Sequence, residues 1–352
     1  MNSKIDHKIN PVQLSIPSLT PESILTYKAG TRPFRKSGMR LEPEYWEDKL
    51  IIHNYGHGGS GISLSWGSAH ICLNILAQEL SKGFRCSKKE IAILGSGIIG
   101  LTMAHLLADQ GWKIHVYASQ FPPHTTSDIA PGLWNKVAVG GNQTEFQIEL
   151  LDQVLKESFK NFKALSESSL PKFKGVSLLD IYTFKEDPPI KNLPKGLFSS
   201  GTPIKGTFSE SLEKQGMLFQ SFLVDTALYI PDLYEKAQAK GVQFKQITFK
   251  TKANLRHLSQ SIIMNCTGFG AKQLFKDPDL IPICGQLIEL KPQAGFNYML
   301  AGPMQGNLDQ YFIPIHDKII LGGSYEFNVD SHLANVTLCE QILENVRHFF
   351  NQ

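Results

Sequence analysis

The stretch from Lys89 to Ser119 constrains this 352-residue chain more than any other part of it. It opens with an apolar run typical of a buried parallel strand and continues through a helical pattern into a second strand. Three glycines in the spacing G-x-G-x-x-G separate the strand from the helix, namely Gly95, Gly97 and Gly100. Such glycines permit a tight turn, a close approach of the backbone to a pyrophosphate, and close packing of helix on strand. The context favours a dinucleotide site over a plain βαβ unit whose glycines only serve packing.

Two features of this stretch need an explanation. A nucleotide-binding strand commonly lies near the start of its domain, yet a long segment precedes Lys89 here. The second strand ends in Val116-Tyr117-Ala118-Ser119, without the acidic residue that holds the ribose hydroxyls of NAD. That absence disfavours an NAD-dependent dehydrogenase.

Composition places the chain among ordinary globular proteins. Its length favours two domains, and its residues are 42% hydrophobic and 19% charged. The net charge of +3 is small and scattered, so we expect no nucleic-acid partner, and we expect no membrane span because apolar runs are short. Five widely spaced cysteines without a C-x-x-C pair indicate a reducing compartment and no structural metal. With no signal peptide or peroxisomal address recognised, the expected location is cytoplasmic.

Periodicity predicts the remaining elements. Helical patterns, one of them capped by Asp225, cover residues 68–80, 146–165, 225–240 and 336–350. Strand patterns cover residues 50–53, 176–184, 217–224, 242–249 and 262–268, the last of which ends in a polar, glycine-containing turn. Four further strands, at 286–290, 298–301, 311–315 and 318–321, are spaced as an antiparallel meander. Residues 1–24 are polar and interrupted by prolines, which predicts a loosely held arm with at most a short strand.

Several short segments are more specific than a generic fold requires. They are Arg32-Pro33-x-Arg35, Arg40-Leu41-Glu42, His53-Asn54-Tyr55-Gly56-His57-Gly58-Gly59-x-Gly61, Ile93 to Leu101, the block from Thr125 to Trp134, Asn265-Cys266-Thr267-Gly268, Tyr311-Phe312-Ile313-Pro314 and Leu321-Gly322-Gly323. Together they resemble the D-amino acid oxidase family of flavoproteins over most of the chain from about residue 26 onward. The segment at 53–61 is the most specific of them.

The order of these segments differs from that of the family. In the family, the Arg-Pro segment and the H-N-Y-G-H-G-G loop follow the L-G-G strand and its helix, whereas here they come first. The resemblance therefore implies a circularly permuted member, in which residues 26–88 are the family's C-terminal part moved to the front. The linker from Gly83 to Glu90 spans at most about 25 Å. The helix at 68–80 should therefore end within that distance of Ile91, and residues 26–82 should not form a separate domain.

The resemblance implies an α/β fold with two domains. We expect a Rossmann-like FAD-binding domain with a parallel sheet, formed by residues 36–135 and 225–275. Residues 1–35, 136–224 and 276–352 would form an α+β substrate domain with a mixed or antiparallel sheet.

The implied cofactor is non-covalently bound FAD. The glycine motif would hold the pyrophosphate of FAD, and the hydroxyl groups of residues 125–127 would contact its phosphates or ribose. A second glycine cluster, residues 56–61, and the two residues after it would direct N–H groups at the edge of the flavin. The implied cofactor-binding residues are Gly58, Gly59, Gly61, Ile62, Ser63, Gly95, Gly97, Ile98, Ile99, Gly100, Ser119, Thr125, Thr126, Ser127, Gly132, Leu133, Phe249 and Thr267. Ser119 and Gln120 stand where members often carry an acidic–basic pair, so the ribose contact is left open.

The resemblance also implies a substrate site. Arg32 would hold an α-carboxylate through two parallel hydrogen bonds, with help from the Tyr311 hydroxyl, and the Gly59 carbonyl would accept from the amine. The family's lid tyrosine has no counterpart in the residues before Tyr311. His53 and His57 are interpreted as structural, since no acidic residue at metal-ligand spacing accompanies them.

The implied reaction is oxidative deamination of a D-amino acid to a 2-oxo acid, ammonia and hydrogen peroxide, by hydride transfer from Cα to flavin. An amino acid and dioxygen are then the partners, and a homodimer is left open. Three alternatives stay open: a glycine or sarcosine oxidase, a D-aspartate oxidase, and a non-catalytic flavoprotein. A further basic side chain in the substrate pocket would favour an acidic substrate.

Overall fold

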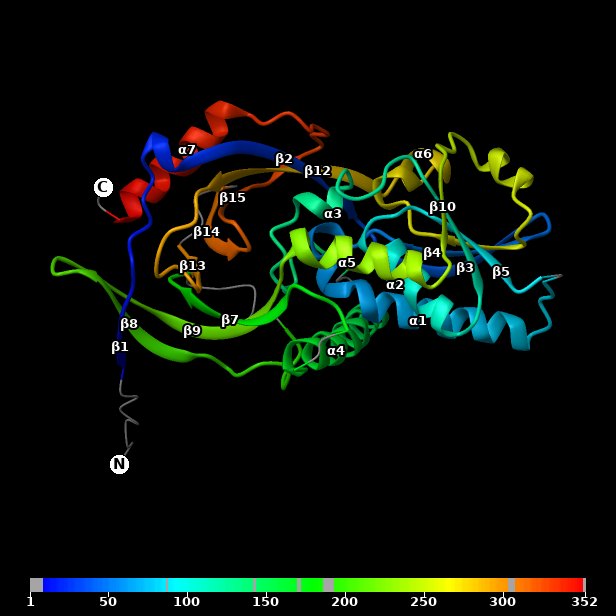
Figure 1. Cartoon of the computed structure of the whole chain (residues 1–352), viewed down its shortest axis with the longest axis horizontal. Helices are drawn as coiled ribbons and strands as arrows, with labels where there is room; N and C mark the ends of the chain where they lie inside the picture. Colours follow the sequence, from blue (N-terminus) through cyan, green and yellow to red (C-terminus); the bar gives the residue numbers. More distant parts are fainter. Residues whose placement is uncertain are drawn as a thin grey trace.

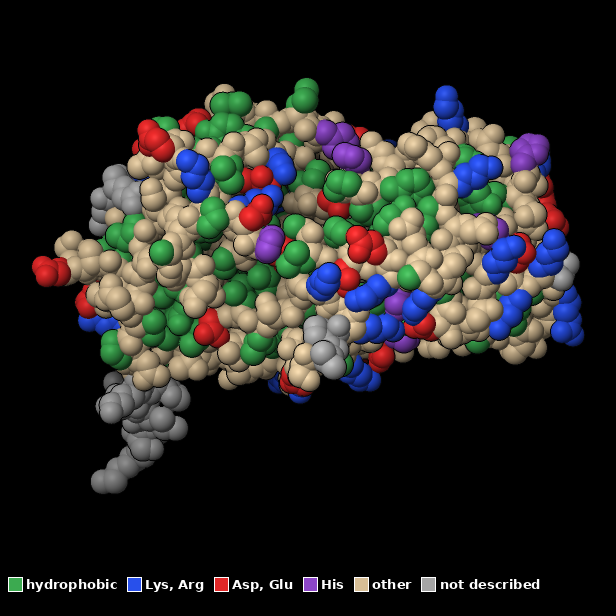
Figure 2. Space-filling model, in the orientation of Figure 1, with side chains coloured by type: hydrophobic (Ala, Val, Ile, Leu, Met, Phe, Trp, Pro, Cys, Tyr) green, Lys and Arg blue, Asp and Glu red, His purple; other side chains and the backbone are tan. Residues whose placement is uncertain are grey.

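The computed structural model describes residues 9–86, 88–141, 144–169, 172–185, 193–302 and 308–350. Two sheets lie end to end along the long axis of the molecule, and the long strands β2 (Ile24–Arg35) and β12 (Leu280–Leu290) run from one half toward the other (Figure 1). On the face shown in Figure 2, acidic and basic side chains are interspersed. The α/β fold class predicted from the sequence is confirmed.

The first sheet is the predicted parallel sheet. Its strands, in spatial order, are β10 (Gln243–Gln246), β6 (Lys113–Ala118), β5 (Glu90–Leu94), β11 (Ile262–Asn265), β4 (Lys49–Tyr55) and β3 (Arg40–Trp46). All neighbours pair in parallel except β3 and β4, which are antiparallel. The central strands are continuous apolar runs because both of their faces are covered, and Ile91 and Ile93 are completely buried. The strand predicted at 242–249 ends early, since β10 stops before Phe249, whereas β11 stops before Thr267, where a polar turn was predicted.

Helices cover this sheet. Their bounds are Gly61–Ser81 for α1, Ile98–Asp109 for α2, Thr226–Ala239 for α5 and Glu145–Glu167 for α4, which packs against α1. The cap predicted at Asp225 is confirmed, since its carboxylate accepts from the Ala227 N–H at 3.0 Å. The helix predicted at 68–80 starts seven residues earlier, at Gly61. The glycine cluster turns directly into the first turn of α1, a boundary that its irregular composition hides.

The second sheet is mixed. Its spatial order is β1 (Asn10–Gln13), β8 (Thr202–Ser209), β9 (Leu212–Val224), β7 (Val176–Thr183), β13 (Met299–Ala301), β14 (Leu308–Ile315), β15 (Lys318–Ser324), β12 and β16 (Glu326–Phe327), with β2 also paired to β12. The predicted antiparallel meander is confirmed in β13, β14 and β15, whereas β12 pairs with β15 and not with β13, the next strand along the chain. Helix α7 (Val336–Phe350) packs on it with Cys339, Ile342, Leu343 and Val346 buried, the spacing of one helix face.

Residues 10–24 are docked more firmly than the loosely held arm predicted from the sequence, although β1 is the short strand that the prediction allowed. Strand β1 pairs in parallel with β8, and Leu14 and Leu19 are 2% and 3% exposed in the same apolar cluster as α7. Single apolar residues between prolines carry no periodic signal, so the sequence concealed this docking.

The segment from β2 through α1 is divided between the two sheets. Strand β4 lies between β3 and β11, and α1 shares its apolar cluster with β5 and α2. At the other end of the chain, the Arg347 guanidinium of α7 donates to the Leu19 carbonyl at 3.0 Å. The end of α7 therefore lies beside the approach to β2. The division of the chain into two domains stays a prediction.

Candidate active site

A cavity of about 420 Å³ opens at the carboxyl ends of β5, β6, β11 and β4, where ligands bind in sheets of this kind. Segments from distant parts of the chain surround it, including residues 30–33 of strand β2. Most of the predicted cofactor residues line it: Gly58, Gly59, Gly61, Ile62, Gly95, Gly97, Ile98, Ile99, Ser119, Thr125, Thr126, Ser127, Phe249 and Thr267. Gly132, Leu133 and Ser63 line a smaller neighbouring cavity instead.

The glycine motif is packed too closely for other residues. Gly95 has φ +101, and a Cβ built there would lie 2.3 Å from the Cys266 carbonyl oxygen at the end of β11. A Cβ on Gly100 would lie 2.1 Å from the Gly95 carbonyl oxygen. Gly100 does not line either cavity and serves the packing of α2 on β5.

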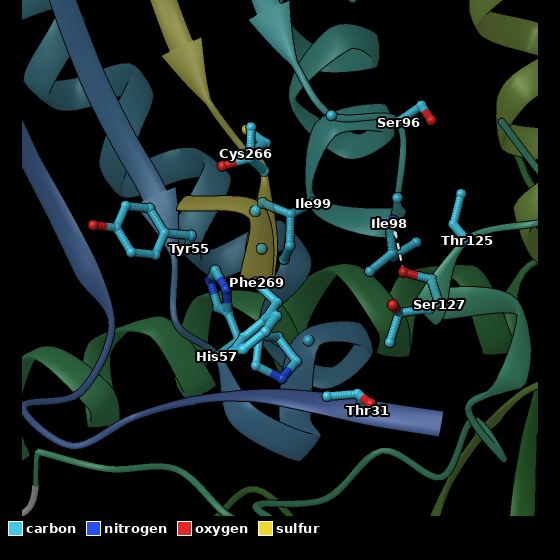
Figure 3. A pocket seen from close by; sticks show the side chains of 18 of the residues that line it. Thr31, Tyr55, His57, Ser96, Ile98, Ile99, Thr125, Ser127, Cys266 and Phe269 are labelled. Carbon is cyan, nitrogen blue, oxygen red and sulfur yellow. Dashed lines mark hydrogen bonds between the residues drawn. The ribbon is translucent and has the colours of Figure 1, made fainter. Parts of the chain in front are cut away.

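The Ser127 hydroxyl, on α3 (Thr126–Ile129), faces the start of α2 (Figure 3). The Ile98 N–H donates to Ser127 Oγ at 3.0 Å, and the Thr125 hydroxyl donates to Asp128 at 2.6 Å. Ser96, which is buried, donates to the Gln120 carbonyl at 2.5 Å and so joins the glycine loop to the end of β6. Ile99, in the same first turn of α2, also lines the cavity, so the N-terminus of α2 opens onto it, a geometry that suits an anion.

The second glycine cluster packs on residues 137–138. A Cβ on Gly58, which has φ +58, would lie 1.7 Å from the Ala138 carbonyl oxygen. The Gly59 N–H donates to the Val137 carbonyl at 3.1 Å. This corrects the expectation for Gly59, because its N–H is already used and is not free for a flavin edge. Gly61, Ile62 and Ser63 form the first turn of α1, whose N–H groups have no partner within the helix.

Buried polar atoms without partners line the large cavity. Among the described residues, the Asn54 amide and the His57 Nε2 atom are buried with no hydrogen bond. Each such group costs about 1–3 kcal/mol unless something satisfies it. Burial lowers the pKa of His57 to about 3, so its ring is neutral at pH 7. These atoms favour a polar ligand in the cavity.

His53 is structural, as predicted. Its Nε2 lies 3.0 Å from a Glu44 carboxylate oxygen, and its Nδ1 lies 2.9 Å from the Asn265 amide nitrogen. Burial lowers the pKa of His53, and the hydrogen bond to Glu44 works in the opposite direction. In the residues that the structure describes, no group of three or more His, Cys, Asp or Glu side chains is arranged to hold a metal ion.

The second cavity, of about 120 Å³, lies over one face of the mixed sheet. It shares Arg32, Gly59 and Ile62 with the large cavity, so the two adjoin. Both predicted substrate-binding side chains, Arg32 and Tyr311, line it.

Arg32 is half-buried at the junction of the two cavities. Its Nη1 donates to the Ser324 carbonyl at 3.0 Å, and its guanidinium carbon lies 4.7 Å from the centre of the Tyr325 ring. Within the described part of the chain, no carboxylate lies within 4.0 Å of this guanidinium. Burial raises the pKa of the Tyr311 hydroxyl, which therefore stays protonated at neutral pH. Arg32 and Tyr311 together offer a guanidinium without a carboxylate partner and a hydroxyl donor, a combination that suits the binding of a carboxylate.

Sequence reasoning missed several residues of the smaller cavity. They are Asn135, Thr183, Lys185, Asp309 and Tyr325. Tyr325 follows Leu321-Gly322-Gly323 closely enough to have been considered with that motif. Residues 306–310, in which the sequence shows no counterpart of the family's lid tyrosine, lie partly outside the described residues, which resume at Leu308.

A comparison of sequences identifies the family. The sequence model of the FAD dependent oxidoreductases (DAO) matches residues 90–352. The D-amino-acid oxidase of Streptomyces coelicolor is 25% identical over 244 residues, which are 67% of this chain and 70% of that protein. The D-aspartate oxidase of Homo sapiens is 24% identical over 244 residues, 66% of this chain and 68% of that protein.

Solved structures share the fold. The L-proline dehydrogenase from P. horikoshii aligns with a TM-score of 0.51 and 16% identity over 75% of this chain and 76% of its own. The glycine oxidase from Geobacillus kaustophilus aligns with a TM-score of 0.50 and 11% identity over 73% and 77%. None of the described helices is both long and apolar enough to cross a membrane. Because the family match covers most of the chain, from the G-x-G-x-x-G strand to its end, the protein belongs to the D-amino acid oxidase (DAO) family and is an FAD-dependent oxidoreductase.

Proposed function

We propose that the protein oxidises D-amino acids, with water and dioxygen, to 2-oxo acids, ammonia and hydrogen peroxide. The observation that carries the proposal is Arg32, a guanidinium without a carboxylate partner, placed with Tyr311 where a small cavity adjoins the large one. Relatives named D-amino-acid oxidase support the same reaction. The amino acid and dioxygen are the small-molecule partners, and a homodimer stays a hypothesis.

The large cavity fits FAD. Its unpartnered Asn54 and His57 atoms call for a polar ligand, and its glycines leave room for backbone contact at the α2 N-terminus. Gly95 and Gly97 would leave space for the pyrophosphate beside the first turn of α2, although the N–H groups of Gly95 and Ile98 are already used. The N–H groups of Gly61, Ile62 and Ser63 would face the ring. When bound, FAD supplies an acceptor for one hydride, which carries the two electrons of the oxidation.

The chain's own residues would orient the substrate. Arg32 would hold the α-carboxylate through guanidinium N–H groups other than the one given to Ser324, and Tyr311 would donate a further hydrogen bond. The Gly59 carbonyl would accept from the amine. The Cα hydrogen then leaves with its electron pair, and water hydrolyses the imine to the oxo acid and ammonia. Alignment of this kind lowers a barrier by up to about 7–11 kcal/mol and needs no general base.

The purified protein is expected to be yellow and to bleach anaerobically when D-alanine is added. The reason is that electrons from the substrate remain on the cofactor when dioxygen is excluded. A panel of D-amino acids, glycine, sarcosine and D-aspartate, with L-alanine as control, separates the candidate oxidases by their rates of bleaching. A yellow protein that no amine or amino acid bleaches would instead be a non-catalytic flavoprotein.

We also propose that the chain is circularly permuted relative to its family. The family match begins at residue 90, while β2, β3 and β4 lie before it and still belong to the two sheets, and α1 packs against β3 and β4. The Arg347–Leu19 hydrogen bond supports a former connection from α7 to β2. The new connection is the short exposed segment between Ser81 and Glu90, which suits a change of chain order.

A reordered chain tests this proposal. Residues 88–352, followed by a flexible Gly/Ser linker and residues 9–86, are expected to fold and to bind one FAD, because the contacts of both sheets are kept. Far-ultraviolet circular dichroism and the flavin absorbance measure the two properties. A control chain with its new ends inside β11, between Met264 and Asn265, should fail because that strand is completely buried. Failure of both chains would contradict the permutation.

A further inference from the structure

Lys185 and Asp309 form an ion pair in the wall of the small cavity. Both side chains are 9% exposed, and Lys185 Nζ contacts Asp309 Oδ1 directly. The Lys185 backbone N–H donates to Thr183 Oγ1 at 3.2 Å, which ties it to the end of β7. Asp309 lies on β14, two residues before Tyr311. The pair therefore faces the same space as the proposed carboxylate site.

The strand register orders the cavity wall into rows. Thr183, Ala301 and Tyr311 are aligned across β7, β13 and β14. On one side of that row lie Ile181, Met299 and Ile313, which are apolar, and on the other side lies the Lys185–Asp309 pair. A small amino acid held by Arg32 and Tyr311 has an apolar wall on one side and an ion pair on the other.

The charges of Lys185 and Asp309 cancel, so the lysine in this pocket does not by itself indicate an acidic substrate. A lone lysine would favour an acidic substrate, but Asp309 opposes a second carboxylate and Lys185 opposes a second cation. A charged substrate side chain would have to separate a buried pair and leave one charge without its partner, which is costly. An uncharged group with both a donor and an acceptor can bond both members without separating them.

We propose, building on the oxidase function above, that Lys185 and Asp309 select D-amino acids with uncharged, hydrogen-bonding side chains. Lys185 would donate to the side-chain oxygen of an amide or hydroxyl, and Asp309 would accept from its N–H or O–H. The substrate class is then D-asparagine, D-glutamine and D-serine, in preference to D-aspartate, D-glutamate and D-lysine. A buried ion pair contributes little net stability, so stability alone gives no reason for its position.

The test compares kcat/KM for D-asparagine with that for D-aspartate, two substrates of nearly equal shape. The wild-type protein should prefer D-asparagine by tenfold or more. Asp309→Asn leaves the Lys185 charge unopposed and should shift the ratio at least tenfold toward D-aspartate. Lys185→Met should lower kcat/KM for both D-asparagine and D-aspartate relative to kcat/KM for D-amino acids with apolar side chains. The controls are Glu213→Gln and Lys205→Met, which break an exposed 2.7 Å ion pair of the same sheet and should leave the ratio unchanged.

Two results would overturn the inference. One is a wild-type preference for D-aspartate over D-asparagine, and the other is an Asp309→Asn ratio within twofold of wild type. Retained flavin and anaerobic bleaching by D-alanine show that a variant is folded and competent. If the wild-type protein holds FAD but no amino acid bleaches it, the oxidase function fails and the inference fails with it. If D-alanine bleaches it but the ratios do not move, only the inference fails.

Discussion

Arg32→Ala is expected to lower kcat/KM for D-amino acids by about a thousandfold or more while the protein stays yellow. A thousandfold loss corresponds to about 4 kcal/mol of transition-state stabilisation. That is the scale expected when two charge-assisted hydrogen bonds and the orientation they impose are lost together. The cofactor should remain because Arg32 lies where the two cavities adjoin, while most of the large cavity is lined by other residues. Steady-state oxygen consumption and the flavin absorbance measure both outcomes.

Two further arginine variants make this result specific. Arg32→Lys keeps the charge but not the planar fork, so it should fall between wild type and Arg32→Ala. Arg256→Ala removes an exposed guanidinium paired with Glu47 on the surface, and it should leave turnover unchanged. Normal turnover in Arg32→Ala would contradict the assignment of the carboxylate site. Loss of flavin in the Arg32→Ala variant would indicate that Arg32 binds the cofactor and not the substrate.

Local patterns predicted much of the fold. The strand, glycine turn and helix of β5 and α2 came from a contiguous run, and α7 came from the 3.6-residue spacing of its apolar face. The start of α5 came from one capping side chain, Asp225. These elements were predictable because the residues that determine them are neighbours in the sequence. The start of α1 was not, because glycines specify neither a helix nor a turn by themselves.

The wall of the small cavity could not be predicted, because the residues that form it are far apart in the sequence. Lys185 and Asp309 are 124 residues apart and meet only because β13 pairs with β7 on one side and β14 on the other. Neither residue belongs to a motif, and each alone would be expected on the surface. Tyr325 likewise reaches Arg32 only through the pairing of β15 with β12 and of β12 with β2. The residues proposed to select the substrate side chain are therefore brought together by strand pairing, while the nucleotide-binding motif is contained in a continuous stretch of sequence.

Gly95→Ala is expected to abolish FAD binding and to lower the stability of the apoprotein, whereas Gly83→Ala should keep both the cofactor and the fold. The two glycines have nearly equal backbone angles, φ +101 and φ +103, so the intrinsic cost of placing alanine there is similar, roughly 1–2 kcal/mol. Their surroundings differ. At Gly95 the new Cβ would lie 2.3 Å from the Cys266 carbonyl oxygen, whereas at Gly83 it meets nothing within 4 Å.

The comparison separates backbone strain from loss of space at the cofactor site. Relief of the contact at residue 95 requires β5 and β11 to move apart at their carboxyl ends, where Gly95 and Cys266 both line the large cavity. Flavin absorbance after gel filtration reports binding, and thermal unfolding reports stability, with a loss of a few degrees expected for Gly83→Ala. If both variants keep FAD, the close approach of the glycine turn to β11 is not required for binding. If both lose it, the left-handed backbone angle matters more than the space around it, and the pyrophosphate would have to be held elsewhere in the cavity.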